Sequence, residues 1–180
     1  MPSRSRNITT CAALVATGLI LGYIESFIVL PVPIPGIRLG LANTVSVFAL
    51  YTLGPVYAFA VLIIRVMLSS VLFSGPAAFA YSIAGAIVSI SVMIVFKKLG
   101  FGILSVSVAG AVIHNIAQTA VAAVLANSRY VFLYIPVLIL CGIFAGLVIG
   151  GIAGLLIVRL KRFVDQEKEQ MWIDGKDKGR

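Results

Sequence analysis

Residues 131–158 read VFLYIPVLILCGIFAGLVIGGIAGLLIV, a run of 28 residues without a charged side chain. A membrane-spanning helix needs about 20 largely apolar residues, so this run is long enough to cross a bilayer. Basic residues follow it directly at Arg159, Lys161 and Arg162. The stretch therefore predicts a transmembrane helix that ends at a membrane surface.

Charges are as sparse in the rest of the chain as in this run. Of the 180 residues 11% are charged and 61% are hydrophobic, and the mean hydropathy is +1.11. Five of the six acidic residues lie in the last 16 positions, and the sixth is Glu25. A water-soluble domain carries about a quarter charged residues. We therefore expect a polytopic membrane protein with one transmembrane domain at 1–162 and a polar cytoplasmic tail at 163–180.

Six apolar stretches separated by helix-breaking residues make up this domain. The predicted spans are 10–30, 39–53, 56–73, 77–96, 103–126 and 131–158. Because the second span is short, we expect it either to tilt little or to begin inside the membrane. A transmembrane β-barrel is the architectural alternative, but its strands alternate apolar and polar residues, unlike the run Val61-Leu62-Ile63-Ile64. The sequence thus predicts an all-α integral membrane protein, a compact bundle of six transmembrane helices.

Basic residues give the expected orientation, because cytoplasmic loops are enriched in lysine and arginine. Seven basic residues flank the helix ends that six spans place on one side: Arg4, Arg6, Lys97, Lys98, Arg159, Lys161 and Arg162. Arg38 and Arg129 flank the opposite ends. We therefore expect a multi-pass protein of the inner or plasma membrane with both termini in the cytoplasm. The net charge of +8 is assigned to topology and not to nucleic-acid binding, since its clusters are short and scattered.

Small residues recur at helical spacing in the last and first spans. The last span carries four glycines at four-residue steps: Gly142, Gly146, Gly150 and Gly154. The first span carries a similar stripe: Ala12, Ala16, Gly18 and Gly22. Such faces let another backbone approach closely. Each stripe therefore predicts either packing within the bundle or docking against a separate membrane subunit.

Polar side chains within the spans gather in the middle and outer half of the expected bundle. They are Glu25, Asn43, Arg65, His114, Asn115 and Gln118. Ionisable groups in lipid are costly unless they are paired or face a cavity, so this set predicts a polar pocket that opens outward and binds a small molecule. Other interpretations need no ligand: Glu25 and Arg65 neutralise one another, His114 and Gln118 form an interhelical hydrogen-bonding patch, and Asn43 caps or bridges helices.

The first outer loop, at 31–38, is rich in proline. Pro31, Pro33 and Pro35 enforce an extended backbone, and Gly36 permits a turn before Arg38. The loop is interpreted either as a lid over the mouth of the pocket or as a rigid connector. Arg38 is correspondingly either a ligand contact or a solvated loop charge.

Several catalytic patterns are absent from the sequence. It has no Gly-x-x-x-x-Gly-Lys-Ser/Thr loop for binding ATP and no pair of aspartates within the spans for a magnesium–diphosphate site. The single histidine excludes a multi-histidine metal centre, and a Ser-His-Asp set is excluded because every aspartate lies in the tail. We therefore expect a protein that is not an enzyme and that has neither a cofactor nor a bound metal.

Four local motifs together point to a known family. They are Pro35-Gly36-Ile37-Arg38-Leu39-Gly40-Leu41-Ala42-Asn43, Arg65, Phe73-Ser74-Gly75-Pro76 and Gly110-Ala111-Val112-Ile113-His114-Asn115-Ile116-Ala117-Gln118. Over about residues 10–162 the set resembles the bacterial family called Gx transporters, also labelled heptaprenyl diphosphate synthase component I. That family in turn resembles the substrate-binding S components of energy-coupling factor (ECF) transporters.

The resemblance implies a receptor that captures a small vitamin-like or cofactor-precursor molecule outside the cell. Its implied partners are a transmembrane coupling subunit and two ATPase subunits. The small-residue stripe of the first span would be the docking face, the loop at 31–38 the gate, and the six polar residues with Arg38 the substrate contacts. Flavin-like, quinone-precursor and other vitamin-like substrates are all compatible with the sequence.

Two other functions stay open. The family label implies a non-catalytic membrane subunit associated with a heptaprenyl diphosphate synthase, although a mere anchor has no need of a polar outward pocket. The sequence also does not separate an S component from a facilitator or channel that works without ATPases.

Overall fold

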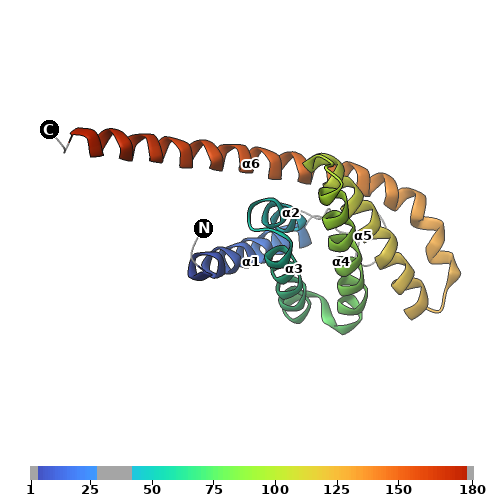
Figure 1. The fold of residues 1–180 in the computed structure, drawn as a ribbon. Coiled ribbons are helices and arrows are strands. Elements are labelled where there is room, and N and C mark those ends of the chain that lie inside the picture. Colours follow the sequence, from blue (N-terminus) through green and yellow to red (C-terminus); the bar gives the residue numbers. More distant parts are fainter. Residues whose placement is uncertain (1–3, 28–41, 178–180) are drawn as a thin grey trace.

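The computed structural model describes residues 4–27 and 42–177, and the regular structure in these ranges is helical throughout. The helices are α1 (Arg4–Ser26), α2 (Asn43–Thr52), α3 (Pro55–Ser69), α4 (Gly75–Lys98), α5 (Ile103–Leu125) and α6 (Ile135–Asp177) (Figure 1). A π-helical turn, Ser70–Ser74, joins α3 to α4, and a 3-10 turn, Arg129–Tyr134, precedes α6. The prediction of an all-helical fold is confirmed.

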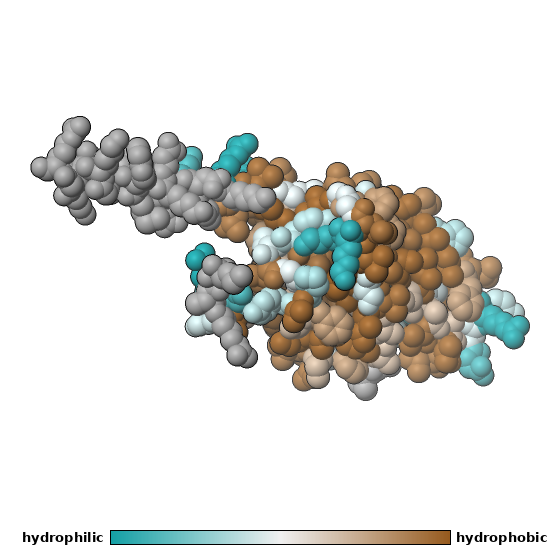
Figure 2. All heavy atoms as spheres, in the orientation of Figure 1, coloured by the Kyte–Doolittle hydropathy of each residue, from teal (hydrophilic) through white to brown (hydrophobic). Residues whose placement is uncertain are grey.

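Five helical segments are long and apolar enough to cross a membrane. They are Ser5–Ile24, Pro55–Phe73, Phe79–Lys98, Ile103–Leu125 and Arg129–Leu160. Large apolar side chains are exposed on their outer faces, for example Val56 at 79% and Val71 at 85%. Figure 2 shows apolar residues over most of the visible face, with hydrophilic ones in a few small areas. Such a surface is incompatible with water, so the chain is an integral membrane protein.

Helix α2 is the exception, because its ten residues rise only about 15 Å. The hydrocarbon core of a bilayer is about 30 Å thick, so α2 alone covers half of that depth. It begins at Asn43, whereas the sequence analysis started the second span at residue 39 and gave that span either little tilt or a start inside the membrane. Six of its ten residues are buried. Helix α2 is therefore an inner helix of the bundle.

Residues with a positive backbone φ angle terminate three helices at the boundaries that the sequence predicted. Gly54 has φ 94° and precedes Pro55, the first residue of α3. Gly100, with φ 86°, follows α4, where the Phe101 amide donates a hydrogen bond to the Phe96 carbonyl. Asn127, with φ 47°, follows α5. Glycine and asparagine tolerate this left-handed conformation best, which explains why these breaks were readable from the sequence.

Two boundaries differ from the prediction. Helix α3 passes through the π-helical turn directly into α4 at Gly75, where a loop at 74–76 was expected. A π turn absorbs an extra residue without ending the hydrogen-bonded helix. Helix α6 continues beyond the apolar run to Asp177 and projects from the bundle (Figure 1), because its tail is rich in the helix-forming residues Glu, Gln, Lys and Met.

The apolar core lies where α2 meets the longer helices. Helix α5 packs between α4 and α6, α2 packs against α3 and α6, and α1 packs against α2 and α3. The core is formed by fully or almost fully buried side chains from five helices, including Leu50, Leu62, Ile90, Val106 and Ile149.

Three glycines of α6 allow its backbone to touch that of α5. A Cβ atom added to Gly146 would lie 2.5 Å from Val108 Cα, and one added to Gly142 would lie 3.1 Å from Val112 Cα. A Cβ on Gly150 would lie 3.2 Å from Leu104 Cα. The glycine stripe of the last span is thus used for packing inside the bundle, which was one of its two interpretations.

A lysine side chain ties the end of α2 to the end of α4. The Lys97 ammonium donates a 2.5 Å hydrogen bond to the Leu50 carbonyl and lies 4.7 Å from the centroid of the Tyr51 ring. A positive charge is favourable at a helix C-terminus, where the last carbonyls have no partner within the helix. Lys97 therefore helps to fix the depth of the short helix within the bundle.

Candidate functional site

Arg65 is the charged residue at the centre of the bundle. It lies in the second half of α3 and only 8% of it is exposed. Its Nη2 donates a 2.8 Å hydrogen bond to Oδ1 of Asn43, the first residue of α2. A guanidinium within a membrane span is costly and faces the interior of the protein. The structure therefore joins two of the predicted site residues directly.

The aliphatic part of Arg65 lies against a glycine of α1. A Cβ atom on Gly18 would lie 2.6 Å from Arg65 Cδ, so the absence of a side chain makes room for the arginine. One turn later, a Cβ on Gly22 would meet Ala42 Cβ at 3.8 Å. Both glycines are buried. Helices α1, α2 and α3 thus meet around the Arg65 side chain.

The four small residues of α1 that the family resemblance assigned to a docking face do not share one face of the helix. Each helical residue turns by about 100°, which puts Gly18 and Gly22 roughly 80–160° around the helix from Ala12 and Ala16. The two alanines are exposed, whereas the two glycines face the interior. A partner that approaches α1 in this conformation can reach the alanines but not the glycines.

His114 and Gln118 of α5 lie side by side against Gly85 of α4. A Cβ on Gly85 would lie 2.6 Å from Gln118 Cγ and 3.1 Å from His114 Nδ1. The His114 side chain is half-buried and interacts electrostatically with the Arg65 guanidinium. His114 thereby connects the interface between α4 and α5 to the polar centre around Arg65.

Asn115 points to a different helix from its neighbour His114. Its Nδ2 donates a 2.9 Å hydrogen bond to the Leu138 carbonyl of α6, and its backbone carbonyl accepts a 2.7 Å hydrogen bond from Thr119 Oγ1. Two consecutive helical residues differ by about 100° in direction, which accounts for the separation. The observed hydrogen bond of the Asn115 side chain therefore joins α5 to α6.

The other predicted site residues lie outside the part of the structure that can be described. These are the gating-loop residues Pro31, Pro33, Pro35 and Gly36, the loop residue Arg38, and the side chain of Glu25, whose backbone belongs to the last turn of α1. Their predicted roles as gate and substrate contacts stay predictions.

The chemistry of the polar centre is that of hydrogen bonding. Arg65 offers a planar set of donors that matches a carboxylate, phosphate or carbonyl group. Asn43 of α2 is hydrogen-bonded to it, and His114 of α5 interacts with it electrostatically. No group of three or more His, Cys, Asp or Glu side chains that could hold a metal occurs among the described residues. The arrangement suits binding of an oxygen-bearing organic molecule.

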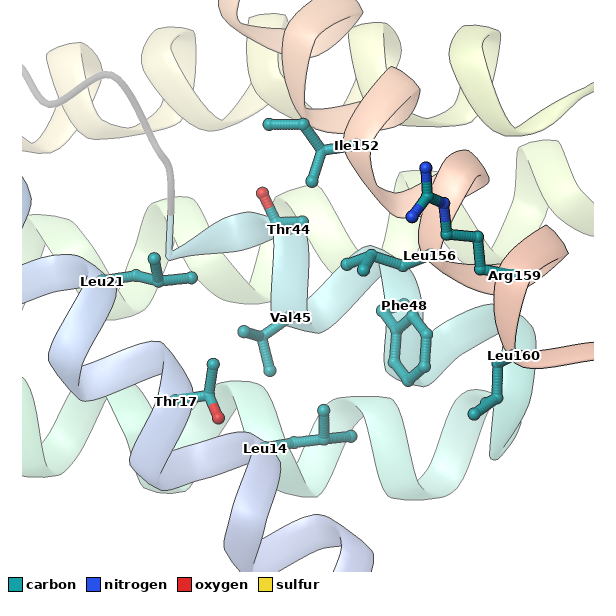
Figure 3. A pocket seen from close by; sticks show the side chains of 10 residues that line it. All are labelled: Leu14, Thr17, Leu21, Thr44, Val45, Phe48, Ile152, Leu156, Arg159 and Leu160. Carbon is teal, nitrogen blue, oxygen red and sulfur yellow. The ribbon is translucent and has the colours of Figure 1, made fainter. Parts of the chain in front are cut away.

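A second feature, an apolar pocket between α1, α2 and α6, was missed by the sequence analysis. Its volume is about 560 Å³. It is lined by Leu14, Thr17, Leu21, Thr44, Val45, Phe48, Ile152, Leu156, Arg159 and Leu160 (Figure 3). Nine of these ten residues are uncharged and look in the sequence like any lipid-facing residue. Arg159, the one charged residue among the ten, contributed to the sequence analysis only as one of the basic residues that predict the membrane orientation.

Comparison with known proteins places this geometry in context. The family model described as heptaprenyl diphosphate synthase component I matches residues 14–156. The fold is similar to a solved structure described as the S component of a bacterial ECF transporter. The TM-score is 0.66 at 22% sequence identity, over 90% of this chain and 99% of that chain. No curated protein matches the sequence. The resemblance drawn from the sequence motifs is confirmed by the family match and by the shared fold.

Proposed function

Since the chain belongs to the family described as heptaprenyl diphosphate synthase component I, we propose a function from this family and from the fold. The fold is similar to that of a transporter S component. We propose that the chain is the substrate-binding subunit of an ECF-type transporter. It binds a small vitamin-like or cofactor-precursor molecule from outside and performs no catalysis itself. A transmembrane coupling subunit and ATPase subunits supply the energy. Both termini lie in the cytoplasm.

The observation that carries this proposal is the hydrogen bond between the buried Arg65 and the half-buried Asn43. Arg65 Nη2 and Asn43 Oδ1 are 2.8 Å apart at the start of α2, the helix that follows the segment 31–38 assigned to the gate. Buried charges in membrane spans mark substrate pathways, and few polar groups in an apolar surrounding are typical of small-molecule sites. We assign Arg65, Asn43, His114 and Gln118 as substrate contacts, with the arginine on an anionic or carbonyl group.

The binding proposal is tested with the protein purified in mild detergent. Small molecules that co-purify are released and identified by mass spectrometry for the unsubstituted chain and for Arg65→Met, with Arg162→Met as the control for an exposed arginine. A charged hydrogen bond contributes about 1.5–3 kcal/mol, so Arg65→Met is expected to retain at least roughly ten-fold less of the same molecule. Equal retention by Arg65→Met and the control would show that the site lies elsewhere.

The docking part of the proposal rests on the exposed face of α1 that carries Ala12 and Ala16. A small residue permits close helix contact, whereas a leucine holds the two backbones apart. Ala16→Leu is expected to leave solute binding unchanged and to abolish co-purification of the coupling subunit, while Ala16→Ser retains both. Co-purification of the coupling subunit with Ala16→Leu would remove this face from the proposal.

A second candidate follows from the family description, which names a heptaprenyl diphosphate synthase. In this case the chain is a non-catalytic membrane subunit of such a synthase, and the apolar pocket beside Arg159 favours it because an isoprenoid diphosphate has an apolar chain and an anionic head. Isolation of the chain from its native membrane separates the candidates. Associated ATPase subunits support the transporter, an associated prenyl synthase supports the membrane subunit, and the absence of both favours an ATPase-independent facilitator.

A further inference from the structure

The apolar pocket between α1, α2 and α6 is separate from the proposed transport site. None of Asn43, Arg65, His114 and Gln118 lines it. It extends along α6 from Ile152 to Leu160, which corresponds to about 12 Å of helix. Its volume of about 560 Å³ lies within the range of roughly 300–1,000 Å³ that is typical of small-molecule sites.

The walls of this pocket suit a hydrocarbon chain. Leucine, valine, isoleucine and phenylalanine side chains form most of its surface (Figure 3). The Thr17 hydroxyl is engaged by its own helix, since its Oγ1 donates a 2.9 Å hydrogen bond to the Ala13 carbonyl. A water-soluble molecule needs several converging polar partners to replace its hydration. The pocket offers few, so its walls select an apolar occupant.

The mouth of the pocket carries a positive charge. Arg159 is exposed and is the only charged residue among the ten that line the pocket. It forms no hydrogen bond or ion pair with any residue in the part of the chain that the structure describes. In Figure 3 the Arg159 guanidinium lies near Leu156, on the α6 side of the pocket. An apolar cavity with one arginine at its edge is complementary to an anionic amphiphile.

The pocket is also open to the bilayer. Leu156 and Leu160 at its edge are each 48% exposed, so a lipid in the membrane can enter without passing through water. Arg159 belongs to the basic cluster that predicts a cytoplasmic position for this end of α6, and the cytoplasmic leaflet carries the anionic lipids. We propose that this pocket binds one acyl chain of an anionic phospholipid whose phosphate contacts Arg159.

The test uses a tryptophan reporter within the pocket. Trp172 is the only tryptophan in the chain and is replaced by phenylalanine, and Phe48→Trp is introduced on that background. The protein is reconstituted in vesicles that contain phosphatidylcholine with brominated phosphatidylglycerol or brominated phosphatidylcholine. One arginine near an anionic surface contributes about five-fold in lipid affinity. Half-maximal quenching is therefore expected at about five-fold less brominated phosphatidylglycerol than brominated phosphatidylcholine.

Two arginine variants separate a site from general attraction to the membrane. Arg159→Gln is expected to remove the preference for phosphatidylglycerol, whereas Arg162→Gln removes the same charge outside the pocket and is expected to preserve it. Equal quenching by the two lipids in the unsubstituted protein, or equal loss of preference in both variants, would overturn the proposal. If Phe48→Trp does not fold, Leu160→Trp at the exposed edge of the pocket gives the same comparison.

A competition arm distinguishes the two sources of an anionic amphiphile. Farnesyl diphosphate is added to vesicles in which brominated phosphatidylglycerol already quenches the reporter. Unchanged quenching supports a bilayer phospholipid as the occupant. Recovery of fluorescence at micromolar farnesyl diphosphate would overturn the assignment to a phospholipid and identify an isoprenoid site instead. Because transport-site residues are untouched, this outcome is independent of the proposed transport function.

Discussion

Gly146 and Gly151 of α6 form a matched pair for measuring how closely α5 and α6 pack. A Cβ atom on Gly146 would lie 2.5 Å from Val108 Cα and 3.1 Å from the Ser107 carbonyl oxygen, both of which are backbone atoms. A Cβ on Gly151 would have no such neighbour within 4 Å. Alanine therefore adds a methyl group to a closed contact at one position and to open space at the other.

The expected difference in stability follows from two opposing contributions. Overpacking costs about 1–3 kcal/mol, and the upper end applies to Gly146→Ala because the α5 backbone must move. Replacing a helical glycine by alanine gains about 1 kcal/mol at either position. We expect Gly146→Ala to lose about 2 kcal/mol and Gly151→Ala to gain about 1 kcal/mol. For a chain of 180 residues the difference corresponds to roughly 6–12 °C in Tm.

Thermal unfolding in mild detergent, monitored by tyrosine fluorescence and by the folded peak in size-exclusion chromatography, measures this difference. Gly146→Ala is expected to unfold at the lower temperature and Gly151→Ala at or above the temperature of the unsubstituted protein. Midpoints within about 2 °C of one another, less than the shift expected for 1 kcal/mol, would refute the close contact between the two backbones.

Two further substitutions test contacts that hold helices together, each by thermal unfolding in detergent. Lys97→Met removes the charged hydrogen bond to the Leu50 carbonyl. The loss of about 2 kcal/mol is expected to lower Tm by roughly 4–8 °C. Lys98→Met, at an exposed lysine, serves as the control, and equal effects of the two substitutions would exclude a role of Lys97 in holding α2 against α4. Asn115→Ala removes the hydrogen bond to the Leu138 carbonyl, worth about 0.6–1.7 kcal/mol in a membrane, so Tm is expected to fall by roughly 1–7 °C. Loss of the co-purified solute in Asn115→Ala would instead indicate substrate contact.

Helix existence could be predicted because apolar length and backbone breakers are local properties of the sequence. Gly54 with Pro55, Gly100 and Asn127 end or start helices where they were expected to. The prediction of a loop at 74–76 was wrong, because a proline such as Pro76 is also tolerated in the first turn of a helix. The chain connects the two helices there with a π turn. The start of α2 depends on tertiary burial, which no local pattern reports.

The polar site was predictable in part, since a charge within an apolar span is conspicuous. This reasoning identified Arg65 and Asn43, which the structure joins by a hydrogen bond. It could not assign directions, because the rotation of each helix is set by its neighbours. His114 and Asn115 therefore looked equivalent, although the first lies against Gly85 and the second contacts α6. The apolar pocket was invisible for a related reason, since its walls have the same composition as the lipid-facing surface.

The contacts also differ in how much movement they permit. Between α5 and α6 the Gly146 position lies against backbone atoms of Val108. The two helices are therefore already in backbone contact and cannot come closer. Between α1 and α2 the Gly22 position meets only Ala42 at 3.8 Å, an ordinary side-chain distance. Closely packed interfaces shift between discrete states and do not deform continuously. The Gly22 position of α1 therefore leaves more room for movement than the Gly146 position of α6.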